Sequence, residues 1–248
     1  MKPDGLTVII PTLNEEKTQI LPQILSSIPK DDRIYTLVVD SGSTDRTLEV
    51  VKQYQTSVVH IKGQTRAERL SFGIQSAQTD MVLLQHPRSL LPSEAYVYLA
   101  QRHKTLNWGG FTHQFDIDHW LLNFTSFYSN RIRPKTSRIL YLDHCIFLRK
   151  SLIEENLPLP EMDIFEDTHI SRLLARSGPP QVLPLASVTS AIRFQTNGVY
   201  RQALINQILK VGYHLKLSPK WMNKIYEAGL QLNTSYDKGG SANRKDNQ

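Results

Sequence analysis

The sequence predicts an α/β protein with a mostly parallel central sheet that is flanked by helices and followed by C-terminal helices. Over roughly the first hundred residues, short apolar runs bounded by turn residues alternate with longer segments of helical period, as in repeated β-α units. These runs are apolar along almost their whole length, which is typical of strands covered by helices on both faces. The combination favours a parallel sheet.

The elements of the first half follow one another as strand and helix. Strands are predicted at 6–10, 34–39, 57–61 and 81–84, and helices at 16–27, 45–54, 66–77 and 93–103. Ligands of such sheets bind beyond the carboxyl ends of the strands. We therefore expect the site in the loops after Ile10, Val39 and Leu84.

The alternation weakens after residue 105. Strands predicted over 108–116 and 141–148 flank a helix over 120–130, and a further helix over 167–177 ends at a Gly-Pro-Pro stop signal. Two amphipathic helices, over 199–217 and 219–228, precede a polar tail from Leu232 that we expect to be disordered.

The composition excludes several classes of protein. Hydrophobic residues make up 40% and charged residues 21% of the 248 residues, which excludes wholesale disorder, collagen-like chains and coiled coils. A single cysteine, Cys145, excludes an intramolecular disulfide and a cysteine-based zinc site. The first apolar run, 6–10, is too short for a signal peptide or a membrane span, so we expect a soluble, cytoplasmic protein. The net charge of +6 predicts an anionic partner.

Polar residues follow the first predicted strand as PTLNEE, residues 11–16. Pro11 ends the strand, and Thr12 or Asn14 can cap the next helix while offering hydrogen bonds to a ligand. The same pattern is also typical of an ordinary loop between a strand and a helix.

The second predicted strand runs into VVDSGSTD, residues 38–45. Asp40 comes at the end of a buried strand, before a glycine turn and before serine and threonine at a helix start. A carboxylate there can accept hydrogen bonds from a ribose or a base, and the free N–H groups of the helix start favour an anion. Asp45 can instead complement the helix dipole, and both interpretations are compatible because that cap does not need Asp40.

Taken together, VIIPTLNEE and VVDSGSTDRT resemble the family 2 glycosyltransferases, whose donor domain has the nucleotide-diphospho-sugar transferase fold called GT-A. Similar segments follow at 65–69 (TRAER), 83–92, 165–174 (FEDTHISRLL) and 189–194 (TSAIRF), the last as in a small bacterial subgroup. The resemblance spans roughly residues 5–228. It implies one GT-A-like domain over 1–231, with a donor half of about 1–105 and an acceptor half of about 106–231, before the tail at 232–248.

The resemblance also implies roles for individual residues. The catalytic base would be Asp167, which removes the proton of the acceptor hydroxyl, and Glu166 would orient it or the acceptor. Because neighbouring residues of a helix point about 100° apart, these two cannot face the acceptor equally. Without the resemblance, the two carboxylates can simply stabilise a helix dipole. The nucleoside pocket would be lined by Pro11, Thr12, Asn14, Glu15, Asp40 and Ser43, with Arg66 near the pyrophosphate.

One motif departs from the family. Arg88 stands where relatives carry an Asp that binds a divalent metal, and no carboxylate occurs between Asp80 and Glu94. A cation cannot ligate Mg²⁺ or Mn²⁺, so we expect no metal site or a severely weakened one. Either Arg88, with Arg66 and Arg193, neutralises the leaving diphosphate directly, or the chain has kept the fold and lost catalysis.

Other basic residues leave alternatives open. The run at 131–138 is interpreted as a solvated loop, although it can also close over phosphates or meet an anionic acceptor. The last two helices combine lysines with apolar residues. They either pack on the domain or form a peripheral contact with the inner membrane face. We expect no nucleic-acid partner, because none of the common nucleic-acid motifs occurs.

The sequence thus predicts a glycosyltransferase that moves a sugar from a nucleotide-diphospho-sugar to a hydroxyl acceptor, with inversion and with weak or no metal dependence. The alternative is a non-catalytic nucleotide-sugar or glycan-binding protein on the same fold. The sugar, the nucleotide base and the acceptor depend on loop shape, which these motifs do not specify.

Overall fold

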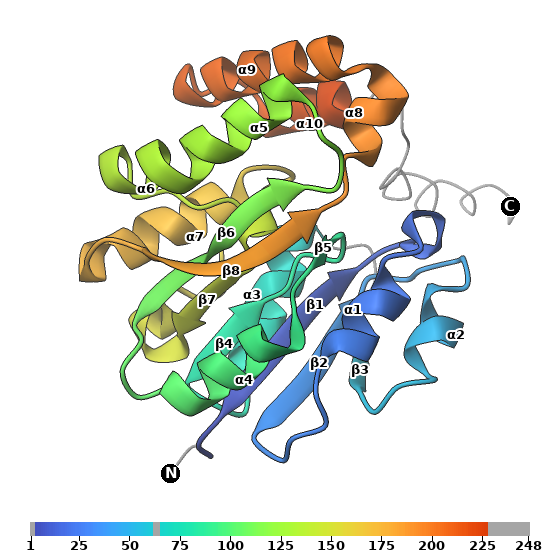
Figure 1. Ribbon diagram of the computed structural model, residues 1–248, viewed down its shortest axis with the longest axis vertical. Coiled ribbons are helices and arrows are strands. Elements are labelled where there is room, and N and C mark those ends of the chain that lie inside the picture. The colour runs from blue at the N-terminus through green and yellow to red at the C-terminus, as the bar shows by residue number, and fades with distance from the viewer. Residues whose placement is uncertain (1–2, 62–64, 228–248) are drawn as a thin grey trace, which may run out of the picture.

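A computed structural model describes residues 3–61 and 65–227, and it confirms the predicted α/β architecture (Figure 1). An eight-stranded sheet has the order β3-β2-β1-β4-β7-β6-β8-β5. Its strands are β1 (Leu6–Thr12), β2 (Ile34–Asp40), β3 (Ser57–His60), β4 (Met81–Leu84), β5 (Ser89–Leu90), β6 (Trp108–Phe115), β7 (Ile146–Arg149) and β8 (Gln181–Thr189). The first four in this order are parallel, whereas β7 runs antiparallel to both β4 and β6.

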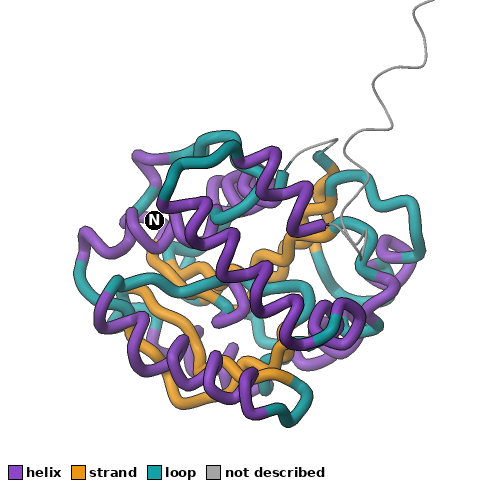
Figure 2. The backbone as a smooth tube through the Cα atoms, turned by 90° about the horizontal axis from the view of Figure 1, so that it is seen from above, coloured by secondary structure: helices purple, strands orange, loops and turns teal. Residues whose placement is uncertain are grey.

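Helices cover the sheet on both faces, as Figure 2 shows from above. They are α1 (Leu21–Ser27), α2 (Thr47–Val51), α3 (Arg66–Ser76), α4 (Ser93–Arg102), α5 (Trp120–Phe127), α6 (Arg133–Thr136), α7 (Glu166–Leu174), α8 (Ile192–Asn197), α9 (Val199–His214) and α10 (Pro219–Glu227). A π-helix, Tyr128–Ile132, joins α5 to α6. The helices α5, α8, α9 and α10 form a layer at one end of the molecule.

The strand β1 has buried side chains on both of its faces. Val8 and Ile10 belong to the core that includes α1 and α4, whereas Ile9 belongs to the core that includes α3 and α7. Successive residues of a strand point to opposite faces, so a strand between two helical layers is apolar throughout. This burial is the physical origin of the continuous apolar runs in the sequence.

The structure corrects several predicted boundaries. The helix expected over 16–27 is split, because Gln19 adopts a left-handed conformation between a 3-10 turn and α1. The strand expected over 141–148 begins only at Ile146, after a 3-10 turn and a left-handed Cys145. The run at 131–138 is not a loop, because the π-helix and α6 occupy most of it.

The strand β8 was not predicted. It contains Pro184, and its pairing with β6 shifts register between Phe111 and Thr112. A proline removes a ladder donor and normally argues against a strand, whereas a local irregularity of this kind accommodates it. The tail predicted from Leu232 lies outside the described residues. Within the described part of the chain, no helix is long and apolar enough to cross a membrane.

Candidate active site

The loops after β1 and β2 are joined through Asp40. Its buried carboxylate accepts hydrogen bonds from Thr12 Oγ1 at 2.9 Å, from the N–H groups of Gly42 and Ser43 at 2.8 and 2.9 Å, and from the Ser43 hydroxyl. Gly42 has a φ of 91°, a conformation that glycine adopts without strain. Asp40 is therefore the group around which the glycine turn folds, and its side chain is fully covered.

The first loop is held against the second by further polar contacts. The Asn14 N–H donates to Ser43 Oγ at 2.9 Å, and Asn14 Oδ1 accepts from the Thr44 N–H at 2.8 Å. Arg69, which we did not single out from the sequence, donates through Nη1 to the carbonyl of Thr12 at 2.9 Å. The predicted nucleoside residues thus lie together at the carboxyl edge of the sheet, and several of their polar groups hydrogen-bond one another.

Arg88 forms an ion pair with Glu15. Its Nε donates to Glu15 Oε2 at 2.9 Å and its Nη2 donates to Oε1 at 3.3 Å, so the contact is forked. The two side chains are only 10% and 4% exposed. The residues at this position do not fit a divalent metal, because a guanidinium occupies the place of the expected carboxylate and Glu15 is engaged by it.

A cleft of about 220 Å³ lies between the sheet and the layer of C-terminal helices. Four of the predicted site residues line it: Arg66, Arg88, Asp167 and Arg193. The other predicted residues do not line it: Pro11, Thr12, Asn14, Glu15, Asp40, Ser43 and Glu166. The cleft therefore contains the three arginines predicted to contact the diphosphate and the predicted base Asp167. The residues predicted to bind the nucleoside lie outside it.

The two carboxylates at the start of α7 have different surroundings. Glu166 is fully buried and forms an ion pair with Arg66 Nε. Asp167 lines the cleft instead, where its Oδ2 accepts a hydrogen bond from the Leu142 N–H at 3.0 Å. This agrees with the expectation that adjacent helical residues cannot face the same ligand equally.

Burial and the adjacent negative charge of Glu166 raise the pKa of Asp167 to about 7, although Arg66 opposes the shift. A carboxylic acid in water titrates near 4. A group that titrates near neutral pH can accept a proton from a substrate and release it again, as a general base must. The raised pKa therefore suits Asp167 to act as a general base.

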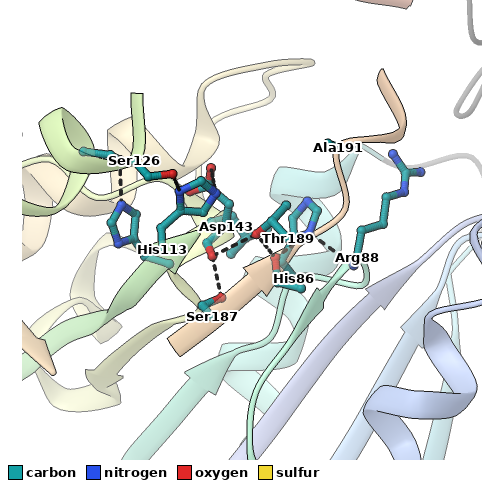
Figure 3. A network of polar contacts seen from close by, with 12 residues as sticks. His86, Arg88, His113, Ser126, Asp143, Ser187, Thr189 and Ala191 are labelled. Atoms are coloured by element: carbon teal, nitrogen blue, oxygen red, sulfur yellow. Dashed lines mark hydrogen bonds and ion pairs between the residues drawn. The ribbon is translucent and has the colours of Figure 1, made fainter. Parts of the chain in front are cut away.

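A second carboxylate, Asp143, was missed by the sequence interpretation. Although burial alone would raise its pKa, the neighbouring His113, His144 and Arg133 hold the pKa of Asp143 at about 2. Its Oδ2 lies 3.5 Å from His113 Nε2, and the hydroxyl of Ser187 donates to its carbonyl at 2.6 Å (Figure 3). The sequence did contain one indication of its importance, because Asp143 is a charged residue within the segment 141–148, which the sequence predicts to be a strand.

His86 completes the wall between Asp143 and Arg88 (Figure 3). Its Nδ1 accepts a hydrogen bond from the Arg88 N–H at 3.1 Å. Burial and the charges of Arg66 and Arg88 hold the pKa of His86 well below its usual range. Because Nδ1 is the acceptor in this contact, Nε2 is the ring nitrogen that can donate a hydrogen bond.

One arginine of the run at 131–138 reaches the cleft. The Arg133 guanidinium lies 3.6 Å from the centre of the Tyr141 ring, and its Nη2 contacts Ser129 Oγ. Lys210 of α9 lies 5.9 Å from the centre of the same ring. Stacking on an aromatic face stabilises a buried guanidinium, which explains why this part of a basic segment is not solvated.

Comparison with known proteins finds similar sequences for the first third of the chain. Residues 7–87 match the family model for Glycosyl transferase family 2. A segment of 56 residues is 41% identical to TagX of Staphylococcus aureus (strain MRSA252) and covers 23% of this chain and 15% of that protein. A segment of 82 residues is 37% identical to an uncharacterized glycosyltransferase of Mycobacterium bovis and covers 33% of this chain and 36% of that protein. The matched segments thus span much less than two thirds of these relatives.

Solved structures resemble a larger part of the chain. TarS 1–349 of Staphylococcus aureus, in complex with UDP-GlcNAc, has a TM-score of 0.58 at 17% identity, covering 75% of this chain and 58% of that one. The mannosyltransferase PcManGT of Pyrobaculum calidifontis, in complex with GDP-Man and Mn²⁺, has a TM-score of 0.58 at 16% identity, covering 91% and 69%. These likenesses confirm the predicted GT-A glycosyltransferase fold.

Proposed function

We propose that this chain, whose residues 7–87 belong to glycosyltransferase family 2 and which has the GT-A fold, is an enzyme that transfers a sugar from a nucleotide-diphospho-sugar to an acceptor hydroxyl with inversion. The observation that carries the proposal is the position of Asp167, a buried carboxylate on the wall of a cation-rich cleft, where burial raises its pKa. The UDP-GlcNAc and GDP-Man complexes of the two structural neighbours support a nucleotide-sugar donor.

In the proposed reaction Asp167 takes the proton of the acceptor hydroxyl while the oxygen forms a bond to the anomeric carbon. Attack comes from the face opposite the leaving group, which inverts the anomeric configuration. The bond from that carbon to the diphosphate oxygen breaks, and its electron pair leaves with the nucleoside diphosphate. Cations fixed around the leaving oxygen lower the barrier because negative charge develops there.

The cations of the cleft differ in what they can offer a diphosphate. Arg66 and Arg88 each share their charge with a buried glutamate, Glu166 and Glu15 respectively. Arg193 donates to the Tyr226 carbonyl at 3.0 Å, and its guanidinium lies 4.1 Å from the centre of the Tyr226 ring. We infer that Glu166 acts by positioning Arg66 rather than by contacting the acceptor.

The proposal is tested by donor turnover. Thermal shift against UDP-, GDP-, CDP- and dTDP-sugars identifies the donor, and release of the nucleoside diphosphate with a panel of hydroxyl acceptors then measures transfer. Product formation that depends on Asp167 supports the proposal. A donor that binds but is never turned over, with every acceptor tried, would show a binding protein instead.

The rate of transfer should depend on pH through Asp167. The ionised carboxylate is the active base, so the rate should rise about tenfold for each pH unit below the pKa of about 7 and level off above it. The measurement is kcat/KM for the acceptor across this range. A rate that is unchanged on both sides of neutrality would contradict the assignment of Asp167 as the base.

We also propose that transfer has weak or no metal dependence, because Arg88 is paired with Glu15 where the metal-binding Asp is expected. Turnover of protein prepared with EDTA should stay within about twofold of turnover with added Mn²⁺, since charge neutralisation is then supplied by guanidinium groups. Arg88→Asp is the matched control, because it sets two carboxylates side by side, and Mn²⁺ should raise the Tm of this variant alone. Loss of all turnover in EDTA would overturn the proposal.

A further inference from the structure

The large apolar side chains that are exposed gather in two segments of the described chain, residues 120–132 and 200–221. These side chains are Trp120, Phe124, Phe127, Tyr128, Ile132, Tyr200, Leu204, Ile208, Val211, Leu215, Leu217 and Trp221. Scattered exposed apolar residues are normal, whereas a gathered set marks an interaction surface. Both segments belong to the helical layer that forms one end of the molecule (Figure 1).

The helix α9 has polar side chains toward the cleft and exposed apolar side chains on its outer side. Gln202, Asn206 and Lys210, spaced four residues apart, line the cleft on its inner side. Leu204 and Val211 face outward and are 62% and 57% exposed. A helix that packs on a soluble domain normally buries its apolar stripe and exposes its polar one. Packing against the described residues therefore does not explain the outward stripe of α9.

The helix α5 repeats this arrangement. Ser126 is buried and hydrogen-bonds His113 at 3.2 Å, whereas Phe124 and Phe127 are more than half exposed. Leu209 of α9 is buried, so the packing expected of the C-terminal helices holds for that residue. The expectation fails for their outer apolar residues.

The two outer stripes form one surface. Trp120 Nε1 donates to the Tyr200 hydroxyl at 3.3 Å, and the two rings lie 6.5 Å apart. Trp221, on α10, follows the end of α9 and is 48% exposed. We call the exposed side chains of residues 120–135 and 200–221 the helical face.

The helical face is basic as well as apolar. Residues 120–135 and 200–221 contain seven of the 29 Lys and Arg residues and none of the 23 Asp and Glu residues, and among those that the structure describes only Arg133 and Lys210 line the cleft. Arg131 and Lys135 are exposed and continue the outer stripe of α5 at helical spacing, and Arg201 and Lys216 border that of α9. Two copies of so basic a face repel each other, whereas an anionic surface attracts it.

We propose that the helical face docks on the surface of an anionic lipid bilayer. The aromatic and aliphatic side chains enter the boundary between headgroups and acyl chains, and the lysines and arginines lie against anionic headgroups. A face that combines Trp, Phe and Leu with Lys and Arg suits this interface, and an apolar protein partner would leave its charges without counter-ions. The docking rests on this face alone and does not depend on the proposed reaction.

The first test is flotation of the full chain with vesicles of phosphatidylcholine, with and without phosphatidylglycerol. We expect binding to the anionic vesicles only, and release at high salt. The triple variant Arg131→Gln, Lys135→Gln, Arg201→Gln should bind about a hundredfold more weakly, at about fivefold for each cation removed. Lys30→Gln with Lys52→Gln, at exposed lysines on the other part of the molecule, is the matched control and should bind as the wild type does.

The second test uses the three tryptophans of the chain. Trp108 is buried, whereas Trp120 and Trp221 are exposed, so a blue shift on adding anionic vesicles must come from the helical face. Trp120→Phe with Trp221→Phe should abolish the shift while flotation persists. A shift that survives in this double variant would contradict the proposed orientation.

Leu204→Glu separates the proposal from self-association, because it places an anion in the apolar stripe without touching the cleft. Vesicle binding should fall at least tenfold, with far-UV circular dichroism and thermal unfolding unchanged. The proposal is overturned if this variant binds vesicles like the wild type. It is also overturned if light scattering shows a dimer that the substitution dissociates while no form of the protein binds vesicles.

Discussion

Asp167→Asn is expected to lower kcat by about 10² to 10⁴-fold, the usual contribution of a positioned general base. The amide cannot take the acceptor proton, but its oxygen can still accept the hydrogen bond that Leu142 donates at 3.0 Å. Donor binding should therefore change little, because Asp167 acts on the acceptor. The measurement is kcat and the donor KM under saturating acceptor.

The thermal stability of Asp167→Asn shows whether a loss of activity comes from unfolding. Burial places the folded-state pKa of Asp167, about 7, above its ordinary value of 3.8, so the folded protein holds this proton more tightly than the unfolded chain does. Any stability gained from that proton is present at low pH and is lost as the pH rises toward and through 7. Above that pH Asn removes a buried charge, but its NH2 group replaces the oxygen that accepts from the Thr168 N–H at 2.6 Å, so the two effects oppose each other and the Tm should change by only a few degrees.

Glu166→Gln gives the matched comparison, because it removes the carboxylate partner of Arg66 within the same turn of α7. We expect this neighbouring substitution to lower the Tm, since it leaves the partly buried Arg66 without its counter-charge.

A kcat for Asp167→Asn within about threefold of the wild type would exclude Asp167 as the general base.

The fold was predictable where burial acts on both faces of a strand. The runs at 6–10, 34–39 and 81–84 are apolar because the sheet between two helical layers leaves no solvated side. The strand β8 escaped prediction because Pro184 and several polar residues interrupt its pattern. Its place in the sheet is set by pairing with β6 and β5, which are distant in sequence.

The site was predictable only in part. The carboxylates at 166 and 167 could be assigned from their motif, and the fold gives them the different surroundings that helical geometry requires. Nothing local in the sequence pairs Arg88 with Glu15, because the two are 73 positions apart and meet only when β1 and β4 lie side by side. Asp143 was missed for a similar reason, since its partners His113 and Ser187 come from β6 and β8.

Arg88→Ala should destabilise the protein by about 3–5 kcal/mol, because it leaves the Glu15 carboxylate buried and unpaired. For a domain of this size, the expected fall in Tm is on the order of 10 °C. Arg33→Ala is the comparison, because it breaks the exposed pair of Arg33 with Asp31 and should leave the Tm almost unchanged. Equal effects of the two substitutions would contradict a structural role for the buried pair.

The double variant Glu15→Gln with Arg88→Met separates stability from chemistry. Removing both charges should restore most of the stability lost in Arg88→Ala, since the penalty comes from an unpaired charge rather than from the missing bond. If Arg88 also stabilises the leaving diphosphate, transfer should stay low in the double variant although the fold is recovered. Recovery of transfer together with Tm would instead assign Arg88 a purely structural role and leave the diphosphate to Arg66 and Arg193, the other two predicted cations that line the cleft.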